Sequence, residues 1–128
     1  MPFELVLAEF GRQHPQSLDQ FRQATRLMSL GEDEASVKVL TALRRQYQED
    51  PSVLFLLGHM AAHRGEWKDA VVLCRRAETR PLGGYRCWYL ANVALKAGEL
   101  DVARTELRHA AQHERFRPGV ERLEKLIN

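Results

Sequence analysis

Two pairs of histidines stand four residues apart, His59 with His63 and His109 with His113. Side chains at this spacing share one face of an α-helix, and two imidazoles so placed can bind a divalent metal. Neither pair forms an H-E-x-x-H motif, and no carboxylate or thiolate stands at a supporting spacing beside the first pair. We therefore expect no metal site and no cofactor. His59 and His63 are instead predicted to contact a peptide, with a pH dependence near the ordinary imidazole pKa of about 6.5.

The sequence contains two cysteines, Cys74 and Cys87. Both fall at apolar positions of predicted helices and are too few for a disulfide framework or a zinc site of the C-x2-C kind. Two buried, reduced thiols are expected. The sequence also has no nucleophile elbow, phosphate-binding loop or acid pair. These observations predict a protein that is not an enzyme.

Length and charge further limit the class of protein and the kinds of partner that the chain can have. The 128 residues are 45% hydrophobic, enough for one domain with a continuous core. The 19 Lys and Arg residues nearly balance 17 Asp and Glu, and they are spread along the chain, which disfavours a nucleic-acid partner. The sequence shows neither a basic leader nor an apolar run of about 18 residues that could cross a bilayer. We expect a cytoplasmic protein that does not insert into membranes.

Helical periodicity alternates with turn signals along the chain. Gly31, Gly65 and Gly98 follow one another at intervals of 34 and 33 residues, and each is followed by glutamate. A helix is predicted from Ser17, as its N-cap, to residue 30, and a second one runs to about residue 49. The helix after each glycine carries two alanines seven residues apart. These pairs are Ala35 with Ala42, Ala70 with Ala77, and Ala103 with Ala110.

The stretch from residue 52 to 81 carries the clearest pattern. It resembles a tetratricopeptide repeat, whose pattern is W-x2-L-G-x2-Y, then A-x3-F, then a proline, over about 34 residues. Leu54 replaces the tryptophan, Ala61 the tyrosine and Cys74 the phenylalanine. The residues that match are Leu57, Gly58, Ala70, Ala77 and Pro81. Because small residues let two helix backbones approach closely, the retained and replaced residues fit one packed seam.

The resemblance implies an all-α fold, a right-handed α-solenoid of three helix pairs. We expect an N-terminal amphipathic segment over residues 1–16 and a degenerate first repeat over 17–50. The second repeat covers 51–83 and the third covers 84–116. A capping helix over 117–128 completes the array, with its proline, Pro118, in the first turn.

The N-terminal segment has its own apolar face. Phe3, Val6, Leu7 and Phe10 follow the i, i+3, i+4, i+7 spacing of a helix that ends by His14-Pro15. An extended arm through Leu5-Val6-Leu7 is the alternative. The segment is expected either to cover the open end of the stack or to lie in the protein's own binding groove, from which a partner displaces it.

In tetratricopeptide proteins the first helix of each unit lines a concave surface. When positions are counted from the turn glycines, Phe21, Phe55 and Trp88 occupy equivalent places. They are predicted to form an aromatic floor for a partner or, alternatively, to fill core between units or be covered by the N-terminal segment. The full predicted partner-binding set is Phe21, Thr25, Met28, Phe55, His59, Ala62, His63, Tyr85, Trp88, Asn92, Leu95 and Lys96.

The resemblance implies a protein-binding module that takes an amphipathic helix or an extended hydrophobic segment of another protein. In size and architecture the chain is similar to the small tetratricopeptide chaperones of bacterial type III secretion. Binding of acidic heat-shock-protein tails is disfavoured, since Phe21, Thr25, Phe55 and Trp88 stand at positions of that lysine, arginine and asparagine clamp. Two alternatives stay open: a self-assembling homo-oligomeric scaffold, and a regulator that responds to metal or pH through its histidines.

Overall fold

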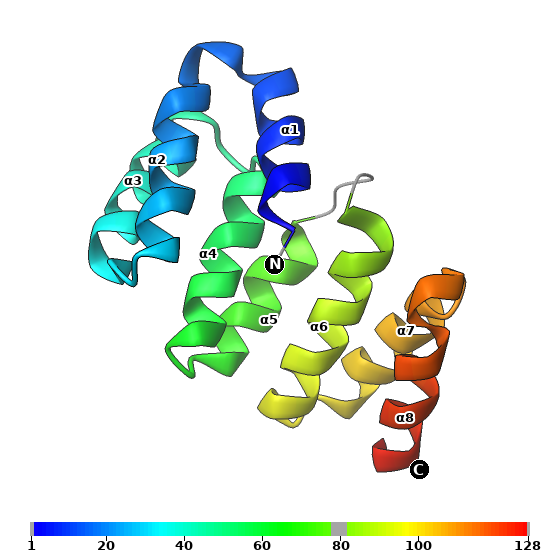
Figure 1. The fold of residues 1–128 in the computed structure, drawn as a ribbon. Coiled ribbons are helices and arrows are strands. Elements are labelled where there is room, and N and C mark those ends of the chain that lie inside the picture. The colour runs from blue at the N-terminus through cyan, green and yellow to red at the C-terminus, as the bar shows by residue number, and fades with distance from the viewer. Residues whose placement is uncertain (1, 78–81, 128) are drawn as a thin grey trace.

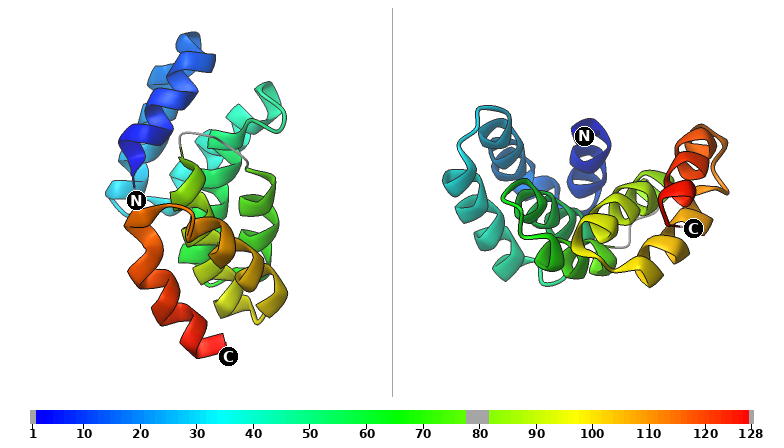
Figure 2. Two further views of the ribbon diagram at one scale, coloured as in Figure 1. Left: turned by 90° about the vertical axis from the view of Figure 1, so that its right-hand side faces the viewer. Right: turned by 90° about the horizontal axis from the view of Figure 1, so that it is seen from below.

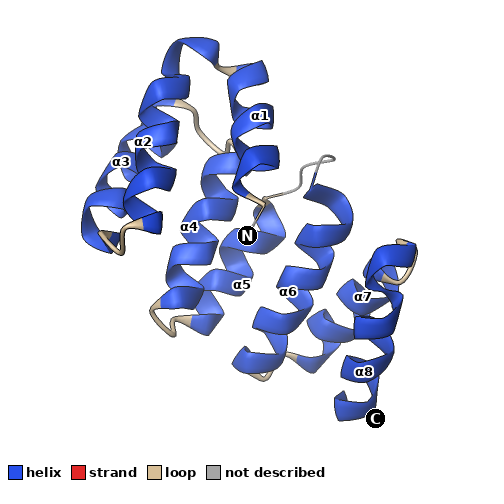
Figure 3. Cartoon of the chain, viewed as in Figure 1, coloured by secondary structure: helices blue, strands red, loops and turns tan. Residues whose placement is uncertain are grey.

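The computed structural model describes residues 2–77 and 82–127. Within those residues the chain is all-α: it forms eight α-helices, joined in places by short 3-10 turns, and no strand (Figure 3). The predicted all-α class is thereby confirmed. The helices are α1 (Phe3–Gln13), α2 (Leu18–Ser29), α3 (Asp33–Gln46), α4 (Pro51–His63), α5 (Trp67–Arg76), α6 (Gly83–Ala97), α7 (Leu100–Ala110) and α8 (Arg117–Ile127).

Each helix packs mainly on its neighbours along the chain (Figure 1). The pairs α2 with α3, α4 with α5, and α6 with α7 are antiparallel and follow one another in a curved array. Seen from below, the array forms an arc, with α1 inside the concave side and α8 at the C-terminal end (Figure 2). α1 contacts α2 and α4, the first helices of two successive pairs. The concave side is therefore already occupied at its N-terminal half.

The three predicted glycine turns have the same backbone geometry. Gly31, Gly65 and Gly98 all have φ of 77°, a left-handed conformation that costs glycine little. The amide of the following glutamate donates to the carbonyl five residues earlier, as from Glu66 to Ala61 at 2.9 Å. This bond satisfies a carbonyl that the helix end would leave unpaired. The structure confirms that these glycines end the first helix of each pair.

The central pair shows why small residues are needed between its helices. A Cβ atom added at Gly58 would lie 2.7 Å from Sγ of Cys74. Ala70 and Ala77 are both completely buried in the same region. The predicted close approach of α4 and α5 is confirmed. Pro81, the proline of the repeat pattern, lies outside the described residues.

The buried core is unevenly distributed along the arc. The largest cluster joins α1 to α4 and includes Val6, Phe10, Phe21 and Phe55. A second cluster lies between α4 and α7 and consists largely of alanine and other small side chains. The third holds α6, α7 and α8 together through five buried residues: Cys87, Ala91, Leu107, Ala110 and Val120. Large aromatic side chains thus dominate only the N-terminal half of the buried interior.

Two local predictions need correction. Ser17 precedes α2 but does not cap it with its side chain, because its Oγ lies 2.6 Å from the hydroxyl oxygen of Tyr47. The second helix of the first pair ends at Gln46 rather than near residue 49, where Glu49 adopts a positive φ of 59°. At the N-terminus the helix alternative is confirmed over the extended arm, since α1 runs through residues 5 to 7.

Candidate functional site

The N-terminal half of the concave face is covered by α1. The rings of Phe10 and Phe21 stack in parallel, with centroids 4.2 Å apart, and both side chains are completely buried. Val6 is buried beside them in the same cluster. The expectation that Phe21 forms an exposed floor is therefore corrected. Phe21 belongs to the core because the apolar face of α1 packs against it.

Phe55 is also completely buried. Its ring lies 6.2 Å from that of Tyr85 and 5.5 Å from that of Tyr89, centroid to centroid. Both tyrosines belong to α6, so α6 covers Phe55. The expectation of an exposed Phe55 is corrected as well. Of the alternatives for the aromatic positions, coverage by the N-terminal segment describes Phe21, and the filling of core between units describes Phe55.

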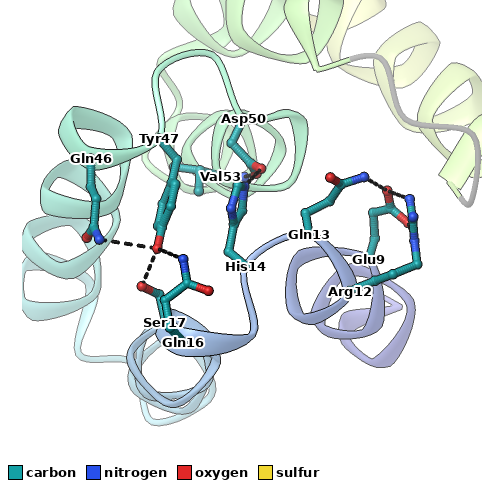
Figure 4. Close-up of polar contacts among 10 residues, drawn as sticks. All are labelled: Glu9, Arg12, Gln13, His14, Gln16, Ser17, Gln46, Tyr47, Asp50 and Val53. Atoms are coloured by element: carbon teal, nitrogen blue, oxygen red, sulfur yellow. Dashed lines mark hydrogen bonds and ion pairs between the residues drawn. The ribbon is translucent and has the colours of Figure 1, made fainter.

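A cluster of polar and aromatic side chains fixes the connection between α1 and α2 (Figure 4). Nε2 of His14 lies 2.9 Å from Oδ2 of Asp50, and its ring stacks on Tyr47 at 3.9 Å between centroids. The Tyr47 hydroxyl in turn bonds Ser17. Asp50 also accepts a hydrogen bond through Oδ1 from the amide of Val53 and so caps α4. These contacts tie α1 to the connection between α3 and α4.

This cluster brings a serine, a histidine and an aspartate together, but not in the arrangement of a nucleophilic triad. Such a triad needs the serine Oγ within hydrogen-bond distance of the imidazole. Here Ser17 Oγ pairs with the Tyr47 hydroxyl, while the observed His14 bond goes to Asp50. The geometry indicates that these contacts hold the end of α1 in place.

The first histidine pair contacts two different partners. Nδ1 of His59 lies 2.9 Å from the hydroxyl oxygen of Tyr89, and the edge of Phe3 approaches the His59 ring. Burial lowers the pKa of His59 to about 4, which keeps this ring neutral at pH 7. The expected titration near 6.5 is therefore corrected for His59. His63 is exposed, and its Nε2 lies 3.7 Å from Oδ2 of Asp33.

Trp88 packs toward the C-terminal helix. Its ring stacks on Phe116 with centroids 6.1 Å apart. A Cβ atom at Gly119 would lie 2.5 Å from the tryptophan ring, so α8 sits directly against it. Asn92, one turn later, donates from Nδ2 to the Trp88 carbonyl at 2.8 Å. Trp88 is half-buried and forms the boundary between α6 and α8 on the concave side.

The other predicted binding residues differ in exposure. Thr25 and Ala62 are buried, each with 6% of its surface exposed. His63 and Lys96 are exposed. The half-buried residues of the predicted set are Met28, His59, Tyr85, Trp88, Asn92 and Leu95. Their contact with a partner stays a prediction.

The structure places four predicted residues and one unpredicted residue on a strip between α1 and α8. The predicted residues are His59, Tyr85, Trp88 and Asn92, and the unpredicted one is Tyr89. Tyr85 and Tyr89 lean toward α4 and stack on each other, whereas Trp88 leans toward α8. Residues 85, 88, 89 and 92 lie on one face of α6, and the line continues to His59 through its Tyr89 bond. Tyr89 was missed because it is not one of the counted repeat positions. Its place four residues after Tyr85 is the signal that could have found it.

A second group of chemically capable side chains lies between α6 and α7. One possible donor atom from each of Cys87, Glu106 and His109 lies within 4.8 Å of the others. Glu106 and His109 are three residues apart on α7, and Cys87 comes from α6. Spacing within one helix could show the first two residues. The cysteine joins them only through packing of the helix pair.

No protein-family model, curated protein or solved structure matches the chain. Among the described residues, no helix combines the length and apolar character needed to cross a membrane.

Proposed function

We propose that the chain is a tetratricopeptide-like solenoid of three helix pairs that binds an amphipathic helix of another protein without catalysing a reaction. The partner helix docks on the strip between α1 and α8, over Tyr85, Tyr89 and Asn92. One observation carries this proposal: α1 is itself an amphipathic helix that lies on the concave side and packs on α2 and α4. The concave face thus has a curvature that accepts a helix.

The composition of the strip suits such a ligand. Tyrosine and tryptophan supply large apolar contact areas, and their polar atoms can pair with groups that become buried on binding. The amide of Asn92 adds a polar group to the strip. Helix-in-groove recognition reads apolar side chains at i, i+3, i+4 and i+7, the same spacing that α1 shows at residues 3, 6, 7 and 10.

The partner is proposed to bind beside α1 rather than replace it. Val6 and Phe10 are completely buried, and exposing each would cost about 1.5–3 kcal/mol. Phe21 would lose its cover at the same time. The His14–Asp50 and Ser17–Tyr47 contacts also hold the start of α2. A partner helix that docks next to α1 avoids these losses.

The decisive experiment places a photo-crosslinking amino acid at position 92 and, as the matched control, at the exposed position Val72 on α5. Both proteins are irradiated in a lysate of the source organism. The proposal expects position 92, and not position 72, to crosslink to one protein through a segment with helical apolar periodicity. Crosslinks at position 72 alone, or at neither position, would contradict it.

The Asn92→Arg substitution tests the site through a measured affinity. A bulky charge on the strip is expected to weaken binding of the identified peptide at least about fivefold, corresponding to about 1 kcal/mol. Val72→Arg should leave that affinity unchanged. If the Asn92 variant remains folded and binds equally well, the site lies elsewhere. Concentration-dependent oligomers that persist in this variant would favour the self-assembling scaffold.

A cytoplasmic chaperone role, as in type III secretion, is the narrower form of the proposal. It is supported by the small size of the chain and the three successive helix pairs. The crosslinked protein distinguishes this form directly. A chaperone client should aggregate when it is produced alone and remain dispersed when it is produced with this chain, whereas a stable partner should remain dispersed in both cases.

A further inference from the structure

We propose that Cys87, Glu106 and His109 form a binding site for Zn²⁺ between α6 and α7. The three possible donor atoms lie within 4.8 Å of one another. A tetrahedral zinc ion holds sulfur at about 2.3 Å and nitrogen or oxygen at about 2.0–2.2 Å, so only small side-chain movements would bring all three into contact. This site does not depend on the proposed partner helix.

The buried carboxylate of Glu106 points independently to a missing ligand. Glu106 is 9% exposed, and its Oε2 atom is buried without a hydrogen-bond partner. Nδ1 of His109 is 3.6 Å away, close enough for an ion pair with a protonated imidazole but too far for a hydrogen bond. A buried carboxylate oxygen without a hydrogen bond is costly, because no donor replaces the water that it has lost. A cation beside this oxygen removes that cost.

The set of donors selects the class of metal. Sulfur and imidazole nitrogen favour borderline-soft ions such as Zn²⁺, whereas Ca²⁺ and Mg²⁺ prefer shells made of oxygen. The Cys87 thiol would release its proton to solvent on binding. One thiolate and one carboxylate would then balance the two positive charges of the ion. Three protein donors leave a fourth coordination position for water.

The surroundings provide both access and support. His109 has 55% of its side-chain surface exposed, so an ion can reach the site from solvent past its imidazole. Cys87 and Glu106 lie at the inner side, with 7% and 9% exposure. Arg86 lies beside the site, with Nη2 4.0 Å from the Cys87 sulfur. Arg86 is itself held by the carbonyl of Cys74 at 3.1 Å.

A metal at this position would link the two helices of the last pair. Cys87 lies near the start of α6, whereas Glu106 and His109 lie near the end of the antiparallel α7. The buried cluster that includes Cys87 also contains Ala91 of α6 and Leu107 and Ala110 of α7. Zinc would add a link between the two helices beside this packing. This pair carries the strip on α6, but metal binding can be measured without any partner.

The test is a Co²⁺ titration of the metal-free full chain, followed by displacement with Zn²⁺. Coordination by Cys87 should produce a thiolate-to-cobalt charge-transfer band and the visible bands of a tetrahedral site, and Zn²⁺ should remove both. Cys87→Ala should abolish the charge-transfer band. Glu106→Gln and His109→Ala should each weaken Co²⁺ binding at least about tenfold, as expected for the loss of one ligand.

Two control variants make the result specific. Cys74→Ala removes the other thiol, which packs against Gly58 and whose pKa burial raises to about 12, and it should keep the full charge-transfer band. His63→Ala removes an exposed histidine of the first pair and should leave Co²⁺ affinity unchanged. Circular dichroism of each variant establishes that it is folded.

The proposal is overturned if folded wild-type protein gives no charge-transfer band. It is also overturned if the band follows Cys74 instead of Cys87, or if the Glu106 and His109 variants bind Co²⁺ as tightly as wild type. A rise in melting temperature with Zn²⁺ in the wild type and the Cys74 variant, but not in folded Glu106→Gln protein, would support it through a second readout.

Discussion

The two ends of the arc are built on the same turn geometry but have different interiors. In the N-terminal half, α1 lays Val6 and Phe10 onto Phe21, and all three are completely buried. In the C-terminal half, Trp88 remains half-exposed against α8. The same helix-pair framework thus has two different interiors, since the residues between the helices change while the glycine turns keep the same backbone geometry.

The physical difference lies in what each interior gains from packing. Aromatic and aliphatic burial stabilises the N-terminal half, at about 25 cal/mol for each Å² of apolar surface removed from water. The last pair buries the polar side chain of Glu106, whose Oε2 has no hydrogen-bond partner, and burial of such a group contributes less to stability. The N-terminal region is stabilised by this burial of apolar surface, whereas ligand binding is proposed only for the C-terminal region.

The largest effect on stability is expected from Phe10→Ala, in the N-terminal half. The substitution removes a ring that is completely buried and stacked on Phe21, so it should lower the free energy of unfolding by about 3–5 kcal/mol. Urea denaturation measures the loss. Leu5→Ala, at a position of α1 with 46% exposure, should cost less than about 1 kcal/mol. Equal effects of the two substitutions would show that α1 is not anchored by its buried face.

A smaller effect is expected where α4 and α5 approach each other. Gly58→Ala puts a Cβ atom 2.7 Å from the Cys74 sulfur and should cost about 1–3 kcal/mol of unfolding free energy. Gly83→Ala is the matched control, because a Cβ atom there meets nothing within 4 Å. Thermal and urea unfolding of both variants provides the comparison. A neutral Gly58→Ala change would mean that the two helices can separate without loss.

The smallest predicted effect concerns pH. The pKa of His59 is lowered by burial to about 4, so the unfolded chain binds its proton more readily than the folded chain between about pH 6.5 and 4. The stability that His59 contributes is complete above about pH 6.5 and is lost as the pH falls toward 4. We expect a loss of about 1 kcal/mol between pH 7 and 5, after allowance for solvent screening.

His59→Gln should remove this part of the pH dependence while keeping a polar group near Tyr89. Urea midpoints of wild type and variant, measured at pH 7 and pH 5, isolate the contribution of the imidazole. If the urea midpoint changes by the same amount between pH 7 and pH 5 in the two proteins, a buried, neutral His59 is contradicted. His63→Gln, at an exposed position four residues later, should show nearly the same change in urea midpoint between pH 7 and pH 5 as the wild type.

Much of the local structure follows directly from the sequence. The glycines at 31, 65 and 98 are followed by glutamates, and their conformational freedom ends a helix wherever the chain must turn back. The apolar spacing of residues 3 to 10 was sufficient to predict α1. Such signals are local, since they depend on periodicity and backbone preference within a few residues.

The candidate sites were less predictable. Counting repeat positions brought out Phe21 and Phe55 as surface candidates, yet α1 and α6 bury them. The same counting omitted Tyr89. Histidine spacing drew attention to His59 with His63 and to His109 with His113. It did not indicate Cys87 or Glu106, which the fold brings close to His109. Burial and donor geometry depend on contacts between residues far apart in sequence, which periodicity does not encode.

The sequence by itself determined that the chain is helical, where its helices turn and which of their faces are apolar. It could do so because helix periodicity and turn chemistry are written within single segments. Only the tertiary structure decided which apolar face covers which, and it placed α1 on the concave side and brought Cys87 to α7. The physical reason is that packing selects among many compatible apolar surfaces by shape and volume, quantities that arise only when the helices meet.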